Sequence, residues 1–318
     1  TNAILNVTSP GQKTVYFLTG HGERNPSDSG GPKGYGSLKE YLEKDNYLVK
    51  ILNLITEKKV PPDCAVLIVA DPQKPLLDDE MKAIETYLKG EGKALFLSDA
   101  LAKGNLPDLT KKYGIVMGSN IVLDVRHSVQ NNPFFFVPDF RFHKITEQLK
   151  TENLGLILLT ARSVEIAKPE RSEYTYQELV ASSAGPDSWA ESNLKQKPLK
   201  FDRGKDIQGP VPIAIAVSLK GQPGKEGEGK SKLVVIGSAG FASNMAARLV
   251  ANLDFTVNSV NWLAEEKEKI SIRPKGKEFD RLLIPTASMS FIFLITVVLV
   301  PGVCVAFGGW VWWKRRSL

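Results

Sequence analysis

Cysteine and histidine are scarce in this chain, which limits the chemistry that its side chains can support. Its 318 residues include 2 cysteines and 3 histidines. Cys304 lies in an uncharged stretch near the end of the chain and Cys64 lies far from it, so we expect no disulfide framework, and no zinc-ligand spacing occurs. The sequence therefore predicts no metal site.

Nucleotide-binding fingerprints are not evident at the two places where glycine and lysine first suggest them. Gly20-His21-Gly22 begins like a dinucleotide-binding loop, but the third glycine of that motif is missing. Pro32-Lys33-Gly34 lacks the residue order of a phosphate-binding P-loop. We therefore expect no cofactor and no ATP hydrolysis by this chain.

An activated nucleophile is not evident either. Hydrolases and amidotransferases with α/β folds place Ser or Cys on a sharp turn flanked by glycines. After the apolar run at residues 94–97 the chain reads Ser98-Asp99-Ala100, without cysteine or glycine, and Ser238 does not have the Gly-x-Ser-x-Gly spacing. These patterns favour a protein that is not an enzyme.

Positive charge is not concentrated in the main part of the chain. Three of the six net positive charges belong to Lys314, Arg315 and Arg316. No basic stripe with interleaved aromatic residues occurs elsewhere, and such a stripe is typical of nucleic-acid-binding domains. Nucleic acid is therefore excluded as an expected partner.

One long uncharged stretch is present, at residues 291–313. As a helix it would be about 34 Å long, enough to cross a hydrocarbon core of about 30 Å. Three tryptophans lie near its end and three basic residues follow at once, a pattern typical of a membrane interface. The sequence thus predicts a single membrane-spanning helix at residues 287–313, with the lipid bilayer as its surroundings.

The flanking charges favour one orientation. Residues 314–318 form a basic tail without acidic residues, whereas acidic residues dilute the basic ones in the stalk at 265–286. We therefore expect a cytoplasmic tail, an extracytoplasmic α/β domain at residues 1–264, and a location in the bacterial inner (plasma) membrane. Because the chain starts at Thr1 without an initiator methionine, we expect it to be a processed or truncated piece, and an upstream export signal or second anchor stays open.

Strand-like and helix-like segments alternate in the first hundred residues. Apolar runs at 14–19, 65–70 and 94–97 are typical of buried strands, and an amphipathic helical pattern covers 76–89. This alternation predicts an α/β fold with a parallel, doubly wound sheet.

The second half is less regular. Residues 211–219 and 233–237 have strand-like patterns, and residues 244–263 have a helical period. Residues 182–210 are polar and rich in Gly, Pro and Lys, so we expect a long polar loop or insertion there. We find no internal repeat.

Small and polar residues follow three of the predicted strands. In an open parallel sheet, ligands bind where strands reach their carboxyl edge, so these residues could converge there. We expect a ligand- or partner-binding rim made of Gly20, His21, Gly22, Glu23, Ser98, Asp99, Ser238 and Asn244. His21 and Glu23 could act as acid, base or metal ligand, or could simply hydrogen-bond the backbone of their own loop.

The ordered motifs of the chain resemble a known family. They include Tyr16-Phe17-Leu18-Thr19-Gly20-His21-Gly22-Glu23, the Asp71-Pro72 turn, Trp189-Ala190-Glu191, Gly237-Ser238, and Ile270-Ser271-Ile272-Arg273-Pro274. In these the chain is similar to the GldG-like auxiliary components of gliding-motility-type ABC transport systems.

The resemblance implies a membrane-tethered domain of flavodoxin-like or class I amidotransferase-like architecture. It also implies that this domain works beside an ABC-2-type permease and a separate ATPase, as part of a homo- or hetero-oligomer. It establishes no catalytic residue. The leading hypothesis is a non-enzymatic auxiliary subunit of a bacterial ABC transport complex. Two alternatives stay open: a membrane-tethered hydrolase acting on a cell-envelope substrate through His21 and Glu23, and a structural envelope protein that forms homo-oligomers.

Overall fold

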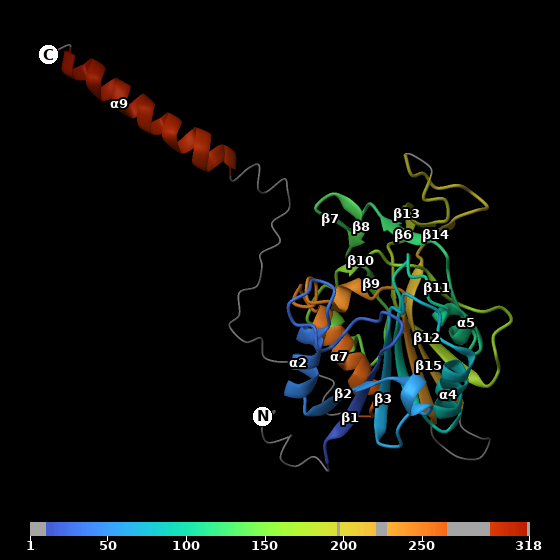
Figure 1. Ribbon diagram of the computed structural model, residues 1–318. Helices are drawn as coiled ribbons and strands as arrows, with labels where there is room; N and C mark the ends of the chain where they lie inside the picture. The colour runs from blue at the N-terminus through green and yellow to red at the C-terminus, as the bar shows by residue number, and fades with distance from the viewer. Residues whose placement is uncertain (1–10, 196–197, 221–227, 266–292, 317–318) are drawn as a thin grey trace.

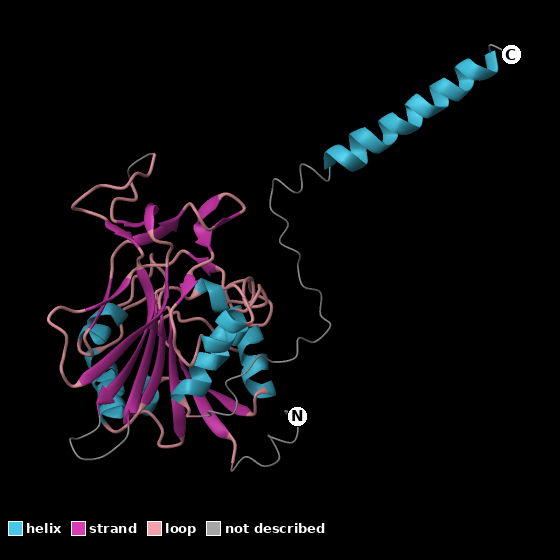
Figure 2. Ribbon diagram, turned by 180° about the vertical axis from the view of Figure 1, so that it is seen from behind, coloured by secondary structure: helices cyan, strands magenta, loops and turns pink. Residues whose placement is uncertain are grey.

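The protein is described here from a computed structural model, which covers residues 11–195, 198–220, 228–265 and 293–316. One large mixed sheet runs through its α/β domain, with helices on both faces (Figures 1 and 2). In spatial order its eight strands are β2 (Tyr47–Leu52), β1 (Lys13–Leu18), β3 (Cys64–Ala70), β4 (Lys93–Leu97), β16 (Glu228–Ile236), β15 (Pro212–Lys220), β12 (Tyr174–Ala181) and β9 (Asp139–Phe140).

The first five strands of that order are mutually parallel, and the last three extend the sheet in antiparallel fashion. The order β2-β1-β3-β4-β16 is that of a flavodoxin-like, doubly wound sheet. The predicted fold class is therefore confirmed, and the antiparallel extension is an addition that the strand-like patterns did not reveal. Only residues 221–227 separate β15 from β16 in the sequence, too few for the helical crossover that parallel neighbours need, and the two strands pair antiparallel.

Helices cover both faces of the sheet. Helices α2 (Gly36–Lys44) and α7 (Asn252–Leu263) lie on one face, and α4 (Asp78–Lys89) and α5 (Leu106–Lys111) lie on the other (Figures 1 and 2). Neighbouring residues of β1 alternate between the two cores: Val15 and Phe17 pack under α2, and Tyr16 and Leu18 pack toward α4. This alternation follows from the two-residue period of a strand. The shorter helical segments are α3 (Leu54–Glu57), α6 (Glu147–Thr151) and the 3₁₀ turn η1 (Gly240–Ala242).

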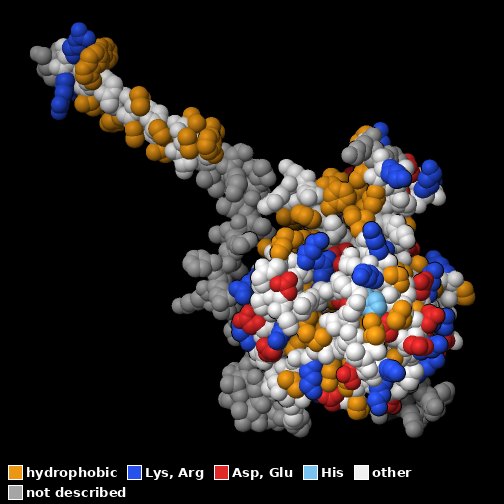
Figure 3. Space-filling view, viewed as in Figure 1, with side chains coloured by type: hydrophobic (Ala, Val, Ile, Leu, Met, Phe, Trp, Pro, Cys, Tyr) orange, Lys and Arg blue, Asp and Glu red, His pale blue; other side chains and the backbone are white. Residues whose placement is uncertain are grey.

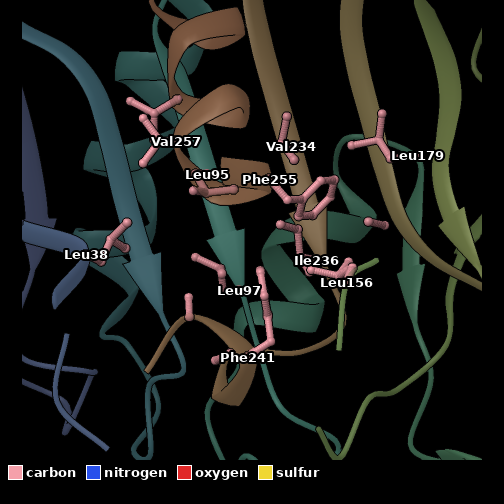
Figure 4. Packing of buried hydrophobic residues seen from close by; sticks show 14 of the residues in the cluster. Leu38, Leu95, Leu97, Leu156, Leu179, Val234, Ile236, Phe241, Phe255 and Val257 are labelled. Carbon is pink, nitrogen blue, oxygen red and sulfur yellow. The ribbon is translucent and has the colours of Figure 1, made fainter. Parts of the chain in front are cut away.

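Helix α7 is buried on all sides, and Figure 4 shows how it packs. Phe255 and Val257 lie over Leu95 of β4 and Val234 of β16, and Phe241 closes the same cluster from below. Fully burying side chains of this size contributes about 1.5–3 kcal/mol each. The helical pattern at 244–263 begins as a helix only at Asn252, because Val250 adopts a positive φ of 45° and interrupts the helical backbone.

A lobe of short strands stands above the carboxyl edge of the main sheet (Figure 1). Two strands lie within residues 182–210, where the sequence predicts a polar loop or insertion. Trp189 and Glu191 of the first of these are buried, which a polar composition does not indicate. The lobe and its neighbours contain three small sheets. One consists of β6 (Ile121–Asp124), β13 (Gly185–Glu191) and β14 (Ile207–Gly209), and a second consists of β7 (Ser128–Val129), β8 (Asn132–Phe136) and β10 (Leu158–Leu159). The third pairs β5 (Ile115–Met117) with β11 (Val164–Ile166).

A separate helix forms the C-terminal end of the described chain. It runs over Leu294–Arg316, with the π-type turns η3 (Leu294–Leu299) leading into α9 (Val300–Arg316), and none of it is buried. It is the one helix among the described residues that is long and apolar enough to cross a membrane. Figure 3 shows hydrophobic side chains along it and basic ones at its end. The predicted stalk at 265–286, apart from its first residue, and residues 287–292 lie outside the described residues.

Candidate functional site

A crevice opens at the carboxyl edge of the sheet, where the strand order reverses. The chain leaves β1 toward one neighbour and returns as β3 on the other side, so the loops after these two strands diverge, as at ligand sites of doubly wound folds. The cavity between them has a volume of about 540 Å³. Residues that line it include Gly22, Glu23, Arg24, Asp28, Lys33, Asp71, Gln73, Asp99, Leu101, Phe135, Thr160 and Met245.

An arginine between two aspartates forms the polar floor of this crevice. Arg24 follows β1, and its Nη2 lies 2.7 Å from Asp71 Oδ2 and 2.6 Å from Asp99 Oδ2. The side chains are 13%, 2% and 13% exposed for Arg24, Asp71 and Asp99, so this network is largely shielded from water. Charge-assisted hydrogen bonds in such surroundings are stronger than bonds between neutral groups.

The two aspartates also organise the backbone around the crevice. Asp99 Oδ1 accepts hydrogen bonds from the N–H groups of Ala239 and Gly240, at 2.6 and 2.9 Å, and so ties β4 to the loop after β16. Asp71 Oδ1 accepts from the N–H of Asp99 at 3.0 Å. Asp71 itself has a φ of 59°, a conformation that Asp and Asn tolerate better than other residues with a Cβ. The carboxylates therefore hold three strand ends in register.

Burial raises the pKa of Asp71 to about 6. The neighbouring carboxylate of Asp99 acts in the same direction, while the guanidinium of Arg24 opposes both. Asp71 is therefore the group of the crevice whose charge is most sensitive to mild acid.

A second buried arginine supports the floor from outside the cavity lining. Arg162 is 4% exposed; its Nη1 donates to Ser98 Oγ at 3.3 Å and its Nη2 to Ala100 O at 3.5 Å. Burial lowers the pKa of Arg162, although Asp71 and Asp99 act to raise it. The Nε atoms of both Arg24 and Arg162 are buried without a hydrogen-bond partner.

His21 faces away from the crevice, toward α4. Its Nε2 lies 3.1 Å from Glu80 Oε2, and its Nδ1 lies 3.7 Å from Glu23 Oε1. The His21 backbone N–H donates to Glu23 Oε2 at 2.8 Å. The three side chains are 7%, 3% and 1% exposed for His21, Glu80 and Glu23. The imidazole thus bridges two carboxylates from the loop after β1 and from the first turn of α4.

The remaining predicted residues hold loops in place. Ser238 Oγ donates to Leu159 O at 2.8 Å, and Ser238 is fully buried. Asn244 Nδ2 donates to Asp28 O at 2.7 Å and Gly31 O at 2.9 Å, and its Oδ1 accepts from the N–H of Ser37 at 2.9 Å. Asn244 thereby fixes the long loop that precedes α2.

The structure divides the predicted rim into two groups. Gly22, Glu23 and Asp99 line the crevice, whereas Gly20, His21, Ser98, Ser238 and Asn244 are not among the residues that line it. Sequence reasoning missed three charged residues as site residues. Arg24 directly follows the glycine-containing loop and Asp71 directly follows a buried strand, so their positions at strand ends were the available signal. Arg162 comes from an irregular segment, and nothing in the sequence indicates that it approaches Ser98.

A P-loop spelling that sequence reasoning also missed occurs at residues 224–231, which read Gly-Lys-Glu-Gly-Glu-Gly-Lys-Ser. A functional P-loop leads from a strand into a helix. Here Glu228–Ile236 form β16, which pairs antiparallel with β15, and Ser231 Oγ donates to Leu88 O and Gly92 O. Residues 221–227 lie outside the described residues. The strand context does not match the motif, so the spelling does not indicate a nucleotide site.

The arrangement in the crevice combines a polar floor with an apolar mouth. No group of three or more His, Cys, Asp or Glu residues that could hold a metal ion occurs in the described part of the chain. The carboxylates of Asp71 and Asp99 are fully engaged by Arg24 and by backbone N–H groups. Exposed Leu101 and Met245 add apolar surface at the mouth.

Comparisons with known proteins place the fold and the family. The N-terminal domain of mmIFT52 has a similar structure, with a TM-score of 0.57 at 17% identity, covering 83% of this chain and 99% of that one. A ThuA-like protein from Bacteroides uniformis gives 0.45 at 17% identity, covering 80% and 92%. A GMP synthase protein from Thermoplasma acidophilum gives 0.42 at 9% identity, covering 82% and 98%. The similarity to the mmIFT52 domain supports the fold alone.

No curated protein sequence matches the chain. The family model described as "ABC-type uncharacterized transport system" (ABC_transp_aux) matches residues 12–259, which include every strand of the main sheet and the first two turns of α7. From this match over most of its length, the chain belongs to the ABC-transporter auxiliary family.

Proposed function

We propose that this chain is a membrane-anchored, non-enzymatic auxiliary subunit of a bacterial ABC transport complex, whose domain binds a partner or ligand at the crevice. Family membership supports association with an ABC transport system. The helix Leu294–Arg316 supplies a suitable membrane anchor. The partners in this proposal are an ABC-2-type permease and a separate ATPase subunit.

One observation carries the binding role. The Arg24, Asp71 and Asp99 side chains pair with one another and fix three strand ends, which leaves an open cavity with a preorganised polar floor. Preorganised polar groups beneath an apolar mouth favour recognition, because little conformational entropy is lost on binding. An acid–base pair aimed into the cavity would favour catalysis instead, and His21 is directed at Glu80.

The proposed location is the inner membrane, with the domain on the extracytoplasmic side. The basic residues at the end of α9 support a cytoplasmic end for that helix, because basic residues are enriched on the cytoplasmic side of membrane spans. The ATPase would then act on the opposite side of the membrane from the crevice. Contact between this chain and the transport complex would involve the permease.

Purification from native membranes in mild detergent tests the proposal. We expect the full chain to co-purify with a P-loop ATPase and a multispanning permease, identified by mass spectrometry. Leu101→Glu places a charge at the mouth of the crevice, on a side chain that is 63% exposed, and should reduce permease recovery at least fivefold. Leu77→Glu, at a 56% exposed position away from the crevice, is the matched control and should leave recovery unchanged.

Two results would count against the proposal. A chain that purifies alone under conditions that preserve other transport complexes would argue against a subunit role. Equal recovery with Leu101→Glu and Leu77→Glu would show that the partner does not contact the crevice.

A further inference from the structure

A second cavity lies at the opposite, amino edge of the sheet. It has a volume of about 700 Å³ and is bounded by the segment that leads into β3, the end of α4 and the first residues of β1 and β4. Val60, Pro61 and Pro62 form an apolar part of its wall. We refer to it as the amino-edge pocket.

The two cavities differ in charge. The amino-edge pocket is lined by four lysines, Lys13, Lys58, Lys59 and Lys93, and by one acidic residue, Glu91. The crevice is lined by four acidic residues and only two basic ones, Arg24 and Lys33. An anion is therefore favoured in the amino-edge pocket and disfavoured in the crevice.

The four lysines have two different roles. Lys13 Nζ donates to Ala264 O at 2.5 Å, and Lys93 Nζ lies 3.4 Å from Glu265 Oε1, so these two hold the pocket wall to the end of α7. Lys58 and Lys59 are exposed, and no hydrogen bond or ion pair engages their ammonium groups in the described part of the chain. Lys58 has a φ of 56° and caps α3, which fixes the backbone that carries both side chains.

The pocket also lies where the chain leaves the domain toward its membrane helix. Ala264 lines the pocket, and Glu265 is held by both Lys93 and Lys232, at 3.4 and 3.5 Å. Although burial opposes ionisation of Glu265, these two lysines lower its pKa. The last described residue of the domain is therefore fixed beside the basic pocket, and the membrane helix follows it later in the sequence.

We propose that the amino-edge pocket binds a phosphate group, supplied by the headgroup of an acidic phospholipid in the bilayer that anchors α9. Three features support this: the positive charge of the pocket, the unengaged ammonium groups of Lys58 and Lys59, and the position of the pocket beside the end of the domain. Lys58 and Lys59 would contact the phosphate, because ammonium groups are suited to phosphate as point charges. The apolar wall at Val60 and Pro62 would contact the glycerol portion of the lipid. Anionic lipid attracts basic segments close to the membrane surface over about one Debye length.

Binding to the detergent-solubilised full chain tests this inference. The probes are a short-chain phosphatidylglycerol, a phosphatidylcholine of the same chain length, glycerophosphoglycerol and inorganic phosphate, each titrated by isothermal calorimetry. We expect phosphatidylglycerol to bind at least tenfold more tightly than phosphatidylcholine. The double variant Lys58→Gln, Lys59→Gln should lose at least tenfold in that affinity. Lys103→Gln, Lys150→Gln removes two exposed lysines elsewhere and should bind as the native chain does.

Each outcome decides one part of the inference. Equal affinity for phosphatidylglycerol and phosphatidylcholine, or an unchanged Lys58→Gln, Lys59→Gln variant, would overturn it. Binding of inorganic phosphate and glycerophosphoglycerol as tight as that of the lipid would overturn the lipid source while supporting the phosphate site. Because Lys58 and Lys59 are exposed, circular dichroism should show the double variant folded, and co-purification with the permease tests the crevice separately.

Discussion

At the scale of single residues, Arg24 is the centre of the crevice. Its guanidinium lies between two carboxylates that are largely shielded from water. Removing one member of such a network leaves the partner charges unpaired, and this costs more than the network contributes when intact. Arg24 therefore serves the fold as well as the site.

We predict that Arg24→Met lowers the free energy of unfolding by about 3 kcal/mol, because Asp71 and Asp99 then face each other without a counter-charge. Urea unfolding followed by tryptophan fluorescence measures the change. Lys82→Ala is the control: its side chain is 73% exposed in a surface pair with Asp79, and its effect should stay below about 0.5 kcal/mol. A similar loss in the free energy of unfolding for Arg24→Met and Lys82→Ala would contradict the buried network.

Asp71 gives a prediction about pH. Its pKa is about 6 in the folded state and about 3.9 in an unfolded chain, so between these values the folded state holds more protons at this carboxyl. This group's stabilising contribution is present at low pH and is lost as pH rises through 6. Asp71→Asn removes that contribution while keeping a residue that tolerates positive φ.

The measurement compares the free energy of unfolding at pH 4.5 and pH 7. Between these pH values the native chain should lose about 1–3 kcal/mol relative to Asp71→Asn, since each pKa unit corresponds to about 1.36 kcal/mol. Asp79→Asn, at a side chain that is 96% exposed, should follow the native profile. Parallel curves for the native chain and Asp71→Asn would refute the raised pKa.

At the scale of elements, His21 joins the loop after β1 to the first turn of α4. Glu80 accepts a hydrogen bond from the N–H of Leu77 as well as facing His21, so one carboxylate caps the helix and holds the loop. His21→Ala should therefore destabilise the domain by about 1–3 kcal/mol, because buried Glu80 loses the imidazole that faces it while Glu23 and Glu80 both stay shielded from water. Thermal unfolding by circular dichroism is the measurement, with His127→Ala as the control.

The variant His21→Ala also distinguishes the proposed binding function from the hydrolase alternative. A hydrolase acting through His21 and Glu23 predicts unchanged stability with loss of turnover on a cell-envelope substrate. A lowered melting temperature without any activity supports the structural role of the Glu23–His21–Glu80 cluster.

The elements of the parallel half were predictable and those of the lobe were not. The strands β1, β3 and β4 are largely apolar because both of their faces are covered by helices. Helix α4 keeps one apolar stripe with Met81, Ile84 and Leu88. The strands β13 and β14 bury only part of their length and carry polar residues, so their pattern resembles a loop. Their pairing with each other and with β6 depends on long-range contacts that no local pattern indicates.

At the scale of the whole molecule, a folded domain and an exposed apolar helix occur in one chain. We predict that the full chain stays with the membrane pellet after extraction at high pH in carbonate, because Leu294–Arg316 exposes its apolar side chains along its whole length. A chain that ends at Glu265 tests the role of the helix and should be released by the same extraction. Recovery of the full chain in the aqueous fraction would contradict the membrane anchor.

The sequence by itself determined the α/β class, the parallel strands and the apolar terminal helix. Each of these depends on the hydrophobic pattern of a continuous segment, which is a local property of the chain. It also indicated Glu23 and Asp99, because both lie in loops that follow predicted strands. Only the tertiary structure decided that His21 turns to Glu80 and that Arg24 joins Asp71 to Asp99. These contacts depend on which strand ends meet, and the strand order that brings them together is set by packing across the entire sheet.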